Sequence, residues 1–177
     1  MNKGLKKYEI KIQALADKKH LFEFEGDSAF FTAFEQEIVQ EGSFNAKIEL
    51  EKSATMLHLS IEIDGFVVLE CDRSLEIFQE PIHISENYIY KFGSVARVID
   101  EKMEVIPFGS TEINVAQHLF DYIMLAIPMK KIHPDYRTDD DDYTFVATIG
   151  SDNDDEEEDE STEIDPRWQA LLNLKKK

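Results

Sequence analysis

Residues 56–75, with the sequence MLHLSIEIDGFVVLECDRSL, decide how the rest of the chain is interpreted. From Leu57 to Ile63, apolar residues at every second position alternate with polar ones. This period of two is typical of a strand with one buried and one solvated face. Asp64 and Gly65 follow, and this dipeptide favours a tight turn between two strands. The stretch is therefore predicted to fold as a β-hairpin.

The register of this hairpin depends on the length of its loop. A two-residue loop would place acidic residues of the second strand on the buried face, whereas a three-residue loop that includes Phe66 places apolar residues there. We prefer the longer loop for this reason. It makes Cys71 a neighbour of Leu59 on the buried face and leaves Arg73 near the rim of the sheet, where it can reach solvent or a partner.

The composition indicates one folded domain of ordinary size. The chain has 177 residues, of which 42% are hydrophobic, and a single cysteine. One cysteine excludes an internal disulfide framework and cannot by itself supply a thiolate zinc site. The sequence contains no run of about 18 or more apolar residues, and its basic start is not followed by a signal-peptide segment. We therefore expect a cytoplasmic protein without a membrane partner or a cofactor.

The net charge of −18 is concentrated in one part of the chain. Residues 135–165 contain fifteen acidic residues against Arg137 alone, so the rest of the chain sums to only −4. A nearly balanced remainder does not exclude nucleic acid as a partner. The blocks at 139–142 and 152–160 repel themselves and lack apolar residues, so this stretch is predicted to be a disordered acidic linker.

Further strands and two helices are predicted on either side of the central stretch. Period-two alternation indicates strands at residues 8–13, 20–25, 44–50 and 82–92, with Pro81 suited to an edge or a strand end. A meander is the simplest topology for these strands. Helical spacing favours a short helix within residues 30–39, after a possible N-cap at residues 26–28.

The strongest helix signal covers residues 111–127. Thr111 is a plausible N-cap, apolar residues then step by three and four, and Pro128 ends the pattern. Its polar stripe is narrow, so this helix should lie deeply against the sheet or be covered by a partner. A second, short amphipathic helix is predicted from Asp165 as N-cap and Pro166 at the first helical position. So short a helix needs a surface to bind.

Together these elements predict an α+β fold. It has a mainly antiparallel β-sheet, arranged as a meander or curved toward a barrel, with one packed amphipathic helix and a short C-terminal helix. Residues 1–134 form the β-rich domain, residues 135–164 the acidic linker and residues 165–177 the terminal helix.

Three pieces of the sequence occur in a characteristic order. They are a Cys-x-Arg-x-Leu box after a strand, a helix that ends in Pro, and a terminal Asp-Pro-Arg-Trp sequence: Cys71, Arg73 and Leu75; Pro128; Asp165, Pro166, Arg167 and Trp168. In this combination the chain resembles the YceD family, the large ribosomal RNA subunit accumulation proteins. The resemblance implies a soluble bacterial protein needed for accumulation or processing of large-subunit (23S) ribosomal RNA, with no enzyme activity assigned.

The chain also departs from the family pattern. Relatives often carry a second cysteine where Ser74 stands here, and many have further cysteines between the Pro-terminated helix and the final Asp-Pro-Arg box. This chain has none in that interval. If those cysteines bind metal in relatives, that site is absent here.

The candidate contact residues are basic or aromatic. Cys71 is interpreted as a small buried hydrophobe, and Arg73 either pairs with Asp72 or contacts RNA phosphate or a ribosomal protein. The terminal helix contributes further candidates, namely Arg167, Trp168, Lys175, Lys176 and Lys177. The amino-terminal lysines Lys3, Lys6 and Lys7 form the other basic cluster.

No catalytic constellation can be assembled from the sequence. The five histidines have no metal-site spacing, and neither a nucleophile elbow nor a Gly-rich phosphate loop occurs. The first hypothesis is a non-catalytic ribosome biogenesis factor that binds pre-ribosomal RNA or a basic ribosomal protein. The alternative is an acidic chaperone that shields a basic ribosomal protein with its Asp/Glu-rich segment. An RNA hydrolase ranks last.

Overall fold

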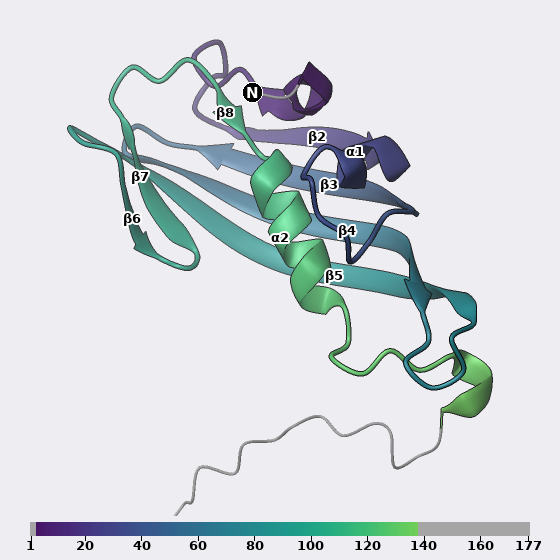
Figure 1. Cartoon of the computed structure of the whole chain (residues 1–177). Coiled ribbons are helices and arrows are strands. Elements are labelled where there is room, and N and C mark those ends of the chain that lie inside the picture. Colours follow the sequence, from purple (N-terminus) through teal and green to yellow (C-terminus); the bar gives the residue numbers. More distant parts are fainter. Residues whose placement is uncertain (1–2, 138–177) are drawn as a thin grey trace, which may run out of the picture. The chain divides into compact units, whose positions relative to one another are not determined.

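A six-stranded sheet organises the protein, whose computed structural model describes residues 3–137 (Figure 1). The strands lie in the order β2-β3-β4-β5-β7-β6, and every neighbouring pair is antiparallel except β5 with β7. Their bounds are β2 (Lys19–Gly26), β3 (Gly42–Lys52), β4 (Met56–Glu70), β5 (Ile77–Gly93), β6 (Arg97–Asp100) and β7 (Met103–Pro107). Strands β2 to β5 form the predicted meander. The sheet ends at β2 and β6, so it does not close into a barrel.

The remaining elements cover one face of the sheet (Figure 1). Strand β1 (Glu9–Ile10) pairs with β8 (Ile113–Asn114) to form a small second sheet. The helical elements are η1 (Lys3–Tyr8), α1 (Ser28–Thr32), α2 (Ala116–Ala126) and η2 (Pro134–Tyr136). Along β3, buried and exposed residues alternate without a break, so one face of the sheet forms the core and the other is solvated. The α+β prediction agrees with this arrangement.

Strand β4 corrects the central prediction. It runs without interruption through Asp64 and Gly65, and Gly65 lies opposite Phe44 of β3 and Ile82 of β5. The predicted hairpin is therefore wrong. The Asp-Gly dipeptide has a local preference for a turn, but pairing with a strand on each side outweighs it.

Gly65 is required in β4 for close packing. A Cβ atom at this position would lie 2.7 Å from the Cα atom of Phe44 and would also overlap the carbonyl oxygen of Ser43. Gly65 takes the inward position between Ile63 and Val67, so the period of two continues through it. At this glycine the backbone of β3 therefore leaves no room for a side chain on β4, and no chain reversal occurs there.

The register differs accordingly. Across the sheet, Leu59 faces Leu50 and Tyr88, and Cys71 follows the end of β4 instead of lying beside Leu59. Cys71 is nonetheless fully buried, as the alternation predicted. Arg73 is exposed, which matches its expected place at the rim.

Helix α2 has its N-cap at Val115, four residues later than predicted. Ile113 lies in β8 and pairs with Ile10 of β1, so the chain is extended where the helix was expected to start. The side-chain oxygen of Asn114 accepts a hydrogen bond from the N–H of Ala116 (2.9 Å) and so satisfies a donor of the first turn. The predicted end is confirmed, because the C-cap is the residue before Pro128.

The other element predictions are mostly confirmed. The strands predicted at residues 20–25, 44–50 and 82–92 correspond to β2, β3 and β5, whereas the one at 8–13 shrinks to the two residues of β1. Within residues 30–39 the helix ends early, at Thr32, and its N-cap Asp27 accepts from the N–H of Ala29. Of the predicted acidic linker, only residues 135–137 are described. The boundaries at 134 and 164 and the helix at 165–177 stay predictions, most of them outside the described residues.

Candidate functional site

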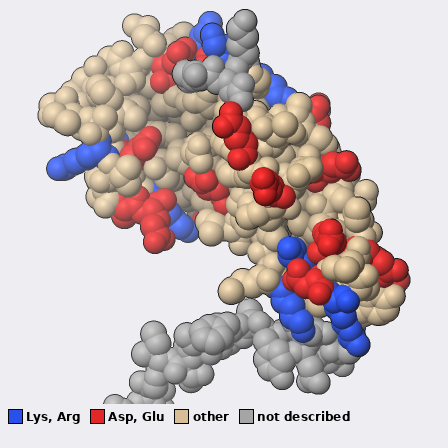
Figure 2. Space-filling view, viewed as in Figure 1, with Lys and Arg blue, Asp and Glu red and all other residues tan. Residues whose placement is uncertain are grey.

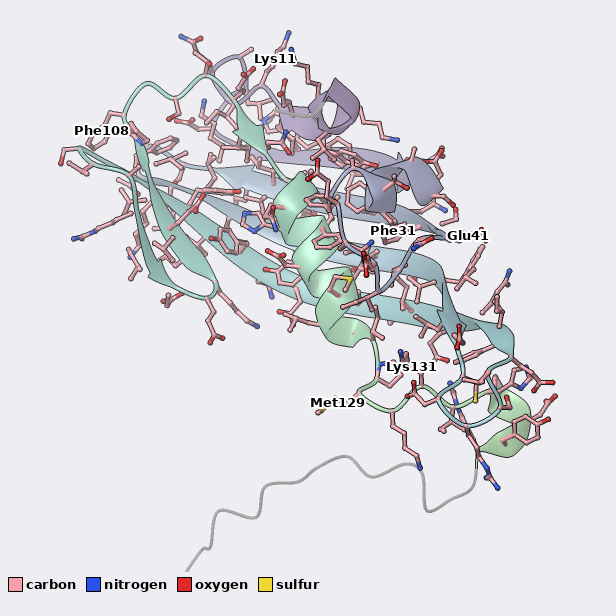
Figure 3. The ribbon with its side chains drawn as sticks, viewed as in Figure 1. Lys11, Phe31, Glu41, Phe108, Met129 and Lys131 are labelled. Carbon is pink, nitrogen blue, oxygen red and sulfur yellow. The ribbon has the colours of Figure 1, made fainter. Side chains whose placement is uncertain are left out.

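Two segments far apart in the sequence meet at one end of the sheet. The turn after β4 contacts the segment after α2, where Lys131 lies (Figure 3). The N–H of Asp72 donates to the carbonyl oxygen of Lys131 (2.8 Å), and the N–H of Lys131 donates to the Asp72 carboxylate (2.8 Å). The Lys131 ammonium lies 3.4 Å from the same carboxylate. We refer to residues 71–76 and 130–137 as the Arg73 corner.

The buried Cys71 thiol also joins the two segments. Its sulfur accepts hydrogen bonds from the N–H groups of Ser74 (3.4 Å) and His133 (3.3 Å). Burial opposes ionisation of the thiol, but the hydrogen bonds from Ser74, His133 and Arg73 outweigh it and lower the pKa of Cys71 to about 7. The sequence suggested a small hydrophobe here, and nothing in the sequence indicated this role as an acceptor.

The turn itself is closed by backbone bonds. The N–H of Leu75 donates to the carbonyl oxygen of Cys71 (2.9 Å), and the N–H of Cys71 donates to that of Glu76 (2.9 Å). Leu75 has a φ of 62°, in the left-handed region that leucine rarely adopts, and its side chain is exposed. The family-motif residues Cys71, Arg73 and Leu75 therefore occupy one tight turn.

Arg73 projects from this turn into solvent. Among residues 3–137, no ion pair or hydrogen bond involves its side chain. Asp72 pairs with Lys131 instead, and the hydrogen bond from the Lys131 N–H lowers the pKa of Asp72. The ion pair between Asp72 and Arg73, considered from the sequence, is therefore not formed.

The segment after α2 is anchored on β5. Ile132 is buried, and the ring of His133 contacts that of Phe78 edge-on, with the centroids 5.5 Å apart. Arg137 donates from Nε to the carbonyl oxygen of Ile132 (3.0 Å), and its guanidinium pairs with Glu80. These contacts hold the described chain against β5 up to Arg137.

The described part of the chain is more negative than the sequence analysis suggested. The net charge of −4 given there was for all residues outside 135–165. Residues 3–137 contain fifteen Lys and Arg against twenty-three Asp and Glu, a net of −8. The near balance depended on four cations in residues 166–177. At the end of the sheet that carries the Arg73 corner, basic and acidic side chains lie interspersed (Figure 2). The corner itself has four basic residues, Arg73, Lys130, Lys131 and Arg137, against three acidic ones, Asp72, Glu76 and Asp135.

The other predicted contact residues are spread along the chain. Lys6 and Lys7 belong to η1, and Pro128 follows α2 directly. The terminal candidates lie outside the described residues: Asp165, Pro166, Arg167, Trp168, Lys175, Lys176 and Lys177. Within residues 3–137, no group of three or more His, Cys, Asp or Glu side chains is arranged to hold a metal ion. In the same range no helix is both long and apolar enough to span a membrane.

The link between Asp72 and Lys131 gives a first prediction. Replacement of Asp72 by alanine should lower the free energy of unfolding by about 1 kcal/mol, because the Lys131 N–H loses its acceptor. Hydrogen exchange at the Lys131 amide should become faster, whereas the matched Glu70→Ala change on the exposed side of β4 should leave it unchanged. Equal exchange rates at Lys131 in both variants would show that the link does not hold the segment.

A second polar cluster, which the sequence did not reveal, lies beneath α2. His118 Nε2 is 2.6 Å from the hydroxyl of Tyr90, and the His118 ring lies 4.0 Å from that of Tyr88, centroid to centroid. Burial lowers the pKa of His118 below its usual 6.5, although the nearby Asp121 charge partly opposes this shift. The folded state therefore disfavours protonation of His118.

This shift gives a pH prediction. Between the lowered pKa and 6.5 the folded chain binds fewer protons than the unfolded chain, so stability rises with pH in that window. The contribution of His118 is complete above pH 6.5 and is lost as the pH falls through its folded pKa. Urea unfolding from pH 5 to 8 should therefore show a shallower acid slope for His118→Gln than for the parent chain. Replacement of His83 by Gln should not make the acid slope shallower, because the hydrogen bond with Asp64 raises the pKa of His83 and its contribution is lost as the pH rises above 6.5.

Comparison with known proteins identifies the family. Neither the curated proteins nor the solved structures contain a match to this chain. The family described as "Large ribosomal RNA subunit accumulation protein YceD" matches residues 59–175, which is more than half of the chain. The matched region includes nearly all of β4, all of β5 and α2, and the Arg73 corner. The chain therefore belongs to the YceD family, whose name refers to the accumulation of large-subunit ribosomal RNA.

Proposed function

We propose that this protein is a non-catalytic ribosome biogenesis factor of the cytoplasm, needed for the accumulation and processing of 23S ribosomal RNA. It acts by binding precursor RNA or a ribosomal protein. The observation that carries the proposal is the family match over residues 59–175, within which the Cys-x-Arg-x-Leu turn lies.

The geometry of the Arg73 corner supports a role in binding. The turn is held by backbone bonds and by the link between Asp72 and Lys131, so the Arg73 side chain starts from a fixed position. A guanidinium can donate two parallel hydrogen bonds to a phosphate or a carboxylate. An exposed arginine without an internal partner among the described residues is suited to such a contact.

Complementation after depletion tests this proposal. Depleted cells should accumulate fewer large subunits in sucrose gradients and contain incompletely processed 23S RNA. The parent chain and an Arg97→Ala control, which alters another exposed arginine, should restore both, whereas Arg73→Ala should not. Normal large subunits in depleted cells would contradict the function, and full rescue by Arg73→Ala would remove this residue from the binding surface.

The absence of catalysis is part of the proposal and has its own test. Purified protein should leave a 23S precursor intact under conditions in which added ribonuclease cleaves it. Cleavage that disappears in a point variant of this chain would establish an enzyme instead.

The second candidate is the acidic chaperone, and charge favours it. The described part has a net charge of −8, and residues 138–165 add fourteen carboxylates without a cation. Such a field attracts lysine-rich proteins over long distances and weakens with salt. Deletion of residues 139–160 should then abolish capture of basic ribosomal proteins at low salt. Unchanged capture at low and high salt would exclude the acidic segment from the mechanism.

A further inference from the structure

Part of β5 has no neighbouring strand on one side. Strand β5 pairs with β4 from Ile77 to Lys91, but β7 reaches only Ile89–Gly93. Phe92 donates its N–H to Thr55, on the β4 side, whereas Ile89 donates to Lys102, on the β7 side. The direction of the backbone N–H and C=O groups alternates from residue to residue along a strand. The N–H and C=O groups of the odd-numbered residues of β5 therefore point away from β4.

The open edge therefore consists of alternate residues from 79 to 87. Pro81 occupies one of these positions and has no N–H to lose, which explains why a proline is tolerated in this long strand. The N–H groups of Gln79, His83, Ser85 and Asn87 have no backbone partner among residues 3–137. Such a row of unpaired groups is a template for another strand.

A groove runs beside this edge. Its volume is about 470 Å³, and it lies between β5, the turn that joins β6 and β7, and the C-terminal half of α2. Its lining includes His83, Ser85, Glu86, Glu101, Tyr122 and Leu125. The Leu125 side chain is 81% exposed, and the Tyr122 hydroxyl oxygen is buried without a hydrogen-bond partner. An exposed apolar side chain and an unpartnered polar atom both lie beside the unpaired strand.

We propose that this groove binds an extended, lysine- or arginine-bearing segment of a basic protein, which adds to β5 as a further strand. This inference rests on the proposed function and specifies its partner as a protein of the large subunit. The partner strand would pair with β5 along residues 79–87, and its side chains would cover Leu125.

The regular spacing of the open groups favours a peptide over RNA. Backbone N–H and C=O groups that recur every second residue match the repeat of a second peptide strand, which gives affinity through main-chain bonds. Nucleic acid has no such ladder of alternating donors and acceptors.

The charges favour a basic segment. Glu86 and Glu101 line the groove, and the Lys102 ammonium lies 2.7 Å from Glu86, so the groove already accepts a lysine of this chain. Burial, together with the charges of Glu86 and Asp121, raises the pKa of Tyr122 to about 12, so its hydroxyl stays a neutral hydrogen-bond donor. The net charge of −8 on residues 3–137 attracts a cationic partner in the same way.

Hydrogen exchange followed by NMR on the isotopically labelled full-length chain tests the strand pairing. The probes are the total protein extracted from large ribosomal subunits and, separately, protein-free 23S RNA. The protein fraction should slow exchange at His83, Ser85 and Asn87, whereas Ile84 and Glu86, already bonded to β4, should not change. Slowing by RNA alone or by neither probe would overturn the proposal. So would slow exchange at these amides in the protein alone, because the edge would then be filled from within the chain.

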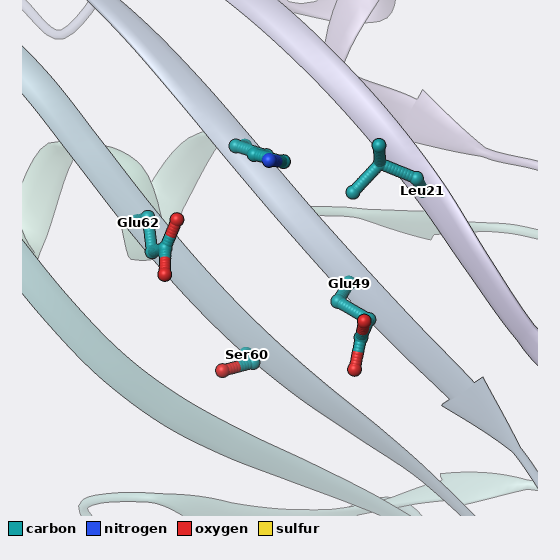
Figure 4. Close-up of a pocket in the computed structure, with 5 residues that line it drawn as sticks. Leu21, Glu49, Ser60 and Glu62 are labelled. Atoms are coloured by element: carbon teal, nitrogen blue, oxygen red, sulfur yellow. The ribbon is translucent and has the colours of Figure 1, made fainter.

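A variant of the groove provides a second test. Leu125→Arg should weaken binding of the large-subunit protein fraction by tenfold or more, because it removes apolar surface and adds a repelling charge. Leu21→Arg, a matched change at an exposed leucine of β2 that lines a different hollow of the sheet (Figure 4), should bind as the parent does. Equal binding by both variants would exclude the groove. If Leu125→Arg also rescues depleted cells fully while depletion itself impairs 23S accumulation, the groove proposal fails and the proposed function stands.

Discussion

Replacement of Gly65 by alanine is expected to lower the free energy of unfolding by about 3 kcal/mol or more, at the upper end of what one added methyl group costs. Gly65 does not have a positive φ, so its backbone can accommodate alanine. The penalty is steric, because the new Cβ atom would lie 2.7 Å from the Phe44 Cα atom and against the Ser43 carbonyl oxygen. These are backbone atoms in the adjacent strand β3 and cannot rotate away.

Denaturant unfolding compares this variant with a matched glycine. Gly4→Ala introduces the same methyl group where no atom lies within 4 Å, and it should change the free energy of unfolding by less than about 1 kcal/mol. If Gly65→Ala fails to fold, a lower yield of soluble protein and a weaker circular dichroism signal than those of Gly4→Ala show the same destabilisation. Similar stability of the two variants would mean that β3 and β4 do not approach as closely as described, and that a turn at residues 64–65 is possible.

Replacement of Leu119 by alanine is the second change with a large expected effect, a loss of about 3 kcal/mol. The Leu119 side chain is fully buried where α2 packs on the sheet, together with Ile123. The truncation removes buried methyl groups and leaves a cavity that the sheet cannot fill. Because α2 leads into the segment that carries Lys131, the loss should also speed exchange of amides in the Arg73 corner.

The same helix supplies the control. Leu125 lies six residues further along α2 and is 81% exposed, so Leu125→Ala should change stability by less than about 0.5 kcal/mol. Thermal or urea unfolding of both variants measures the difference. A comparable loss in both would mean that the face of α2 assigned to the core is wrong.

The sequence by itself determined which residues are buried. The period of two in residues 57–63 and 44–50 identifies the core side chains correctly, whereas in α2 the spacing by three and four identifies Ala116 and Ile123 but leaves out the fully buried Leu119. This works because burial follows from side-chain chemistry and from the repeat of each element, both of which are local properties. The exposure of Arg73 could be predicted on the same basis, whereas the family resemblance rested on the order of three short sequence motifs.

Only the tertiary structure decided where the chain reverses and which segments meet. Pairing on both sides makes Gly65 part of a strand, and pairing with Ile10 delays the start of α2 beyond Ile113. The bonds between Asp72 and Lys131 and the open edge of β5 likewise depend on partners distant in the sequence. Local propensities amount to about 1 kcal/mol or less per residue, whereas a strand paired on both sides gains packing and hydrogen bonds along its whole length. The long-range contacts therefore prevailed wherever the two disagreed.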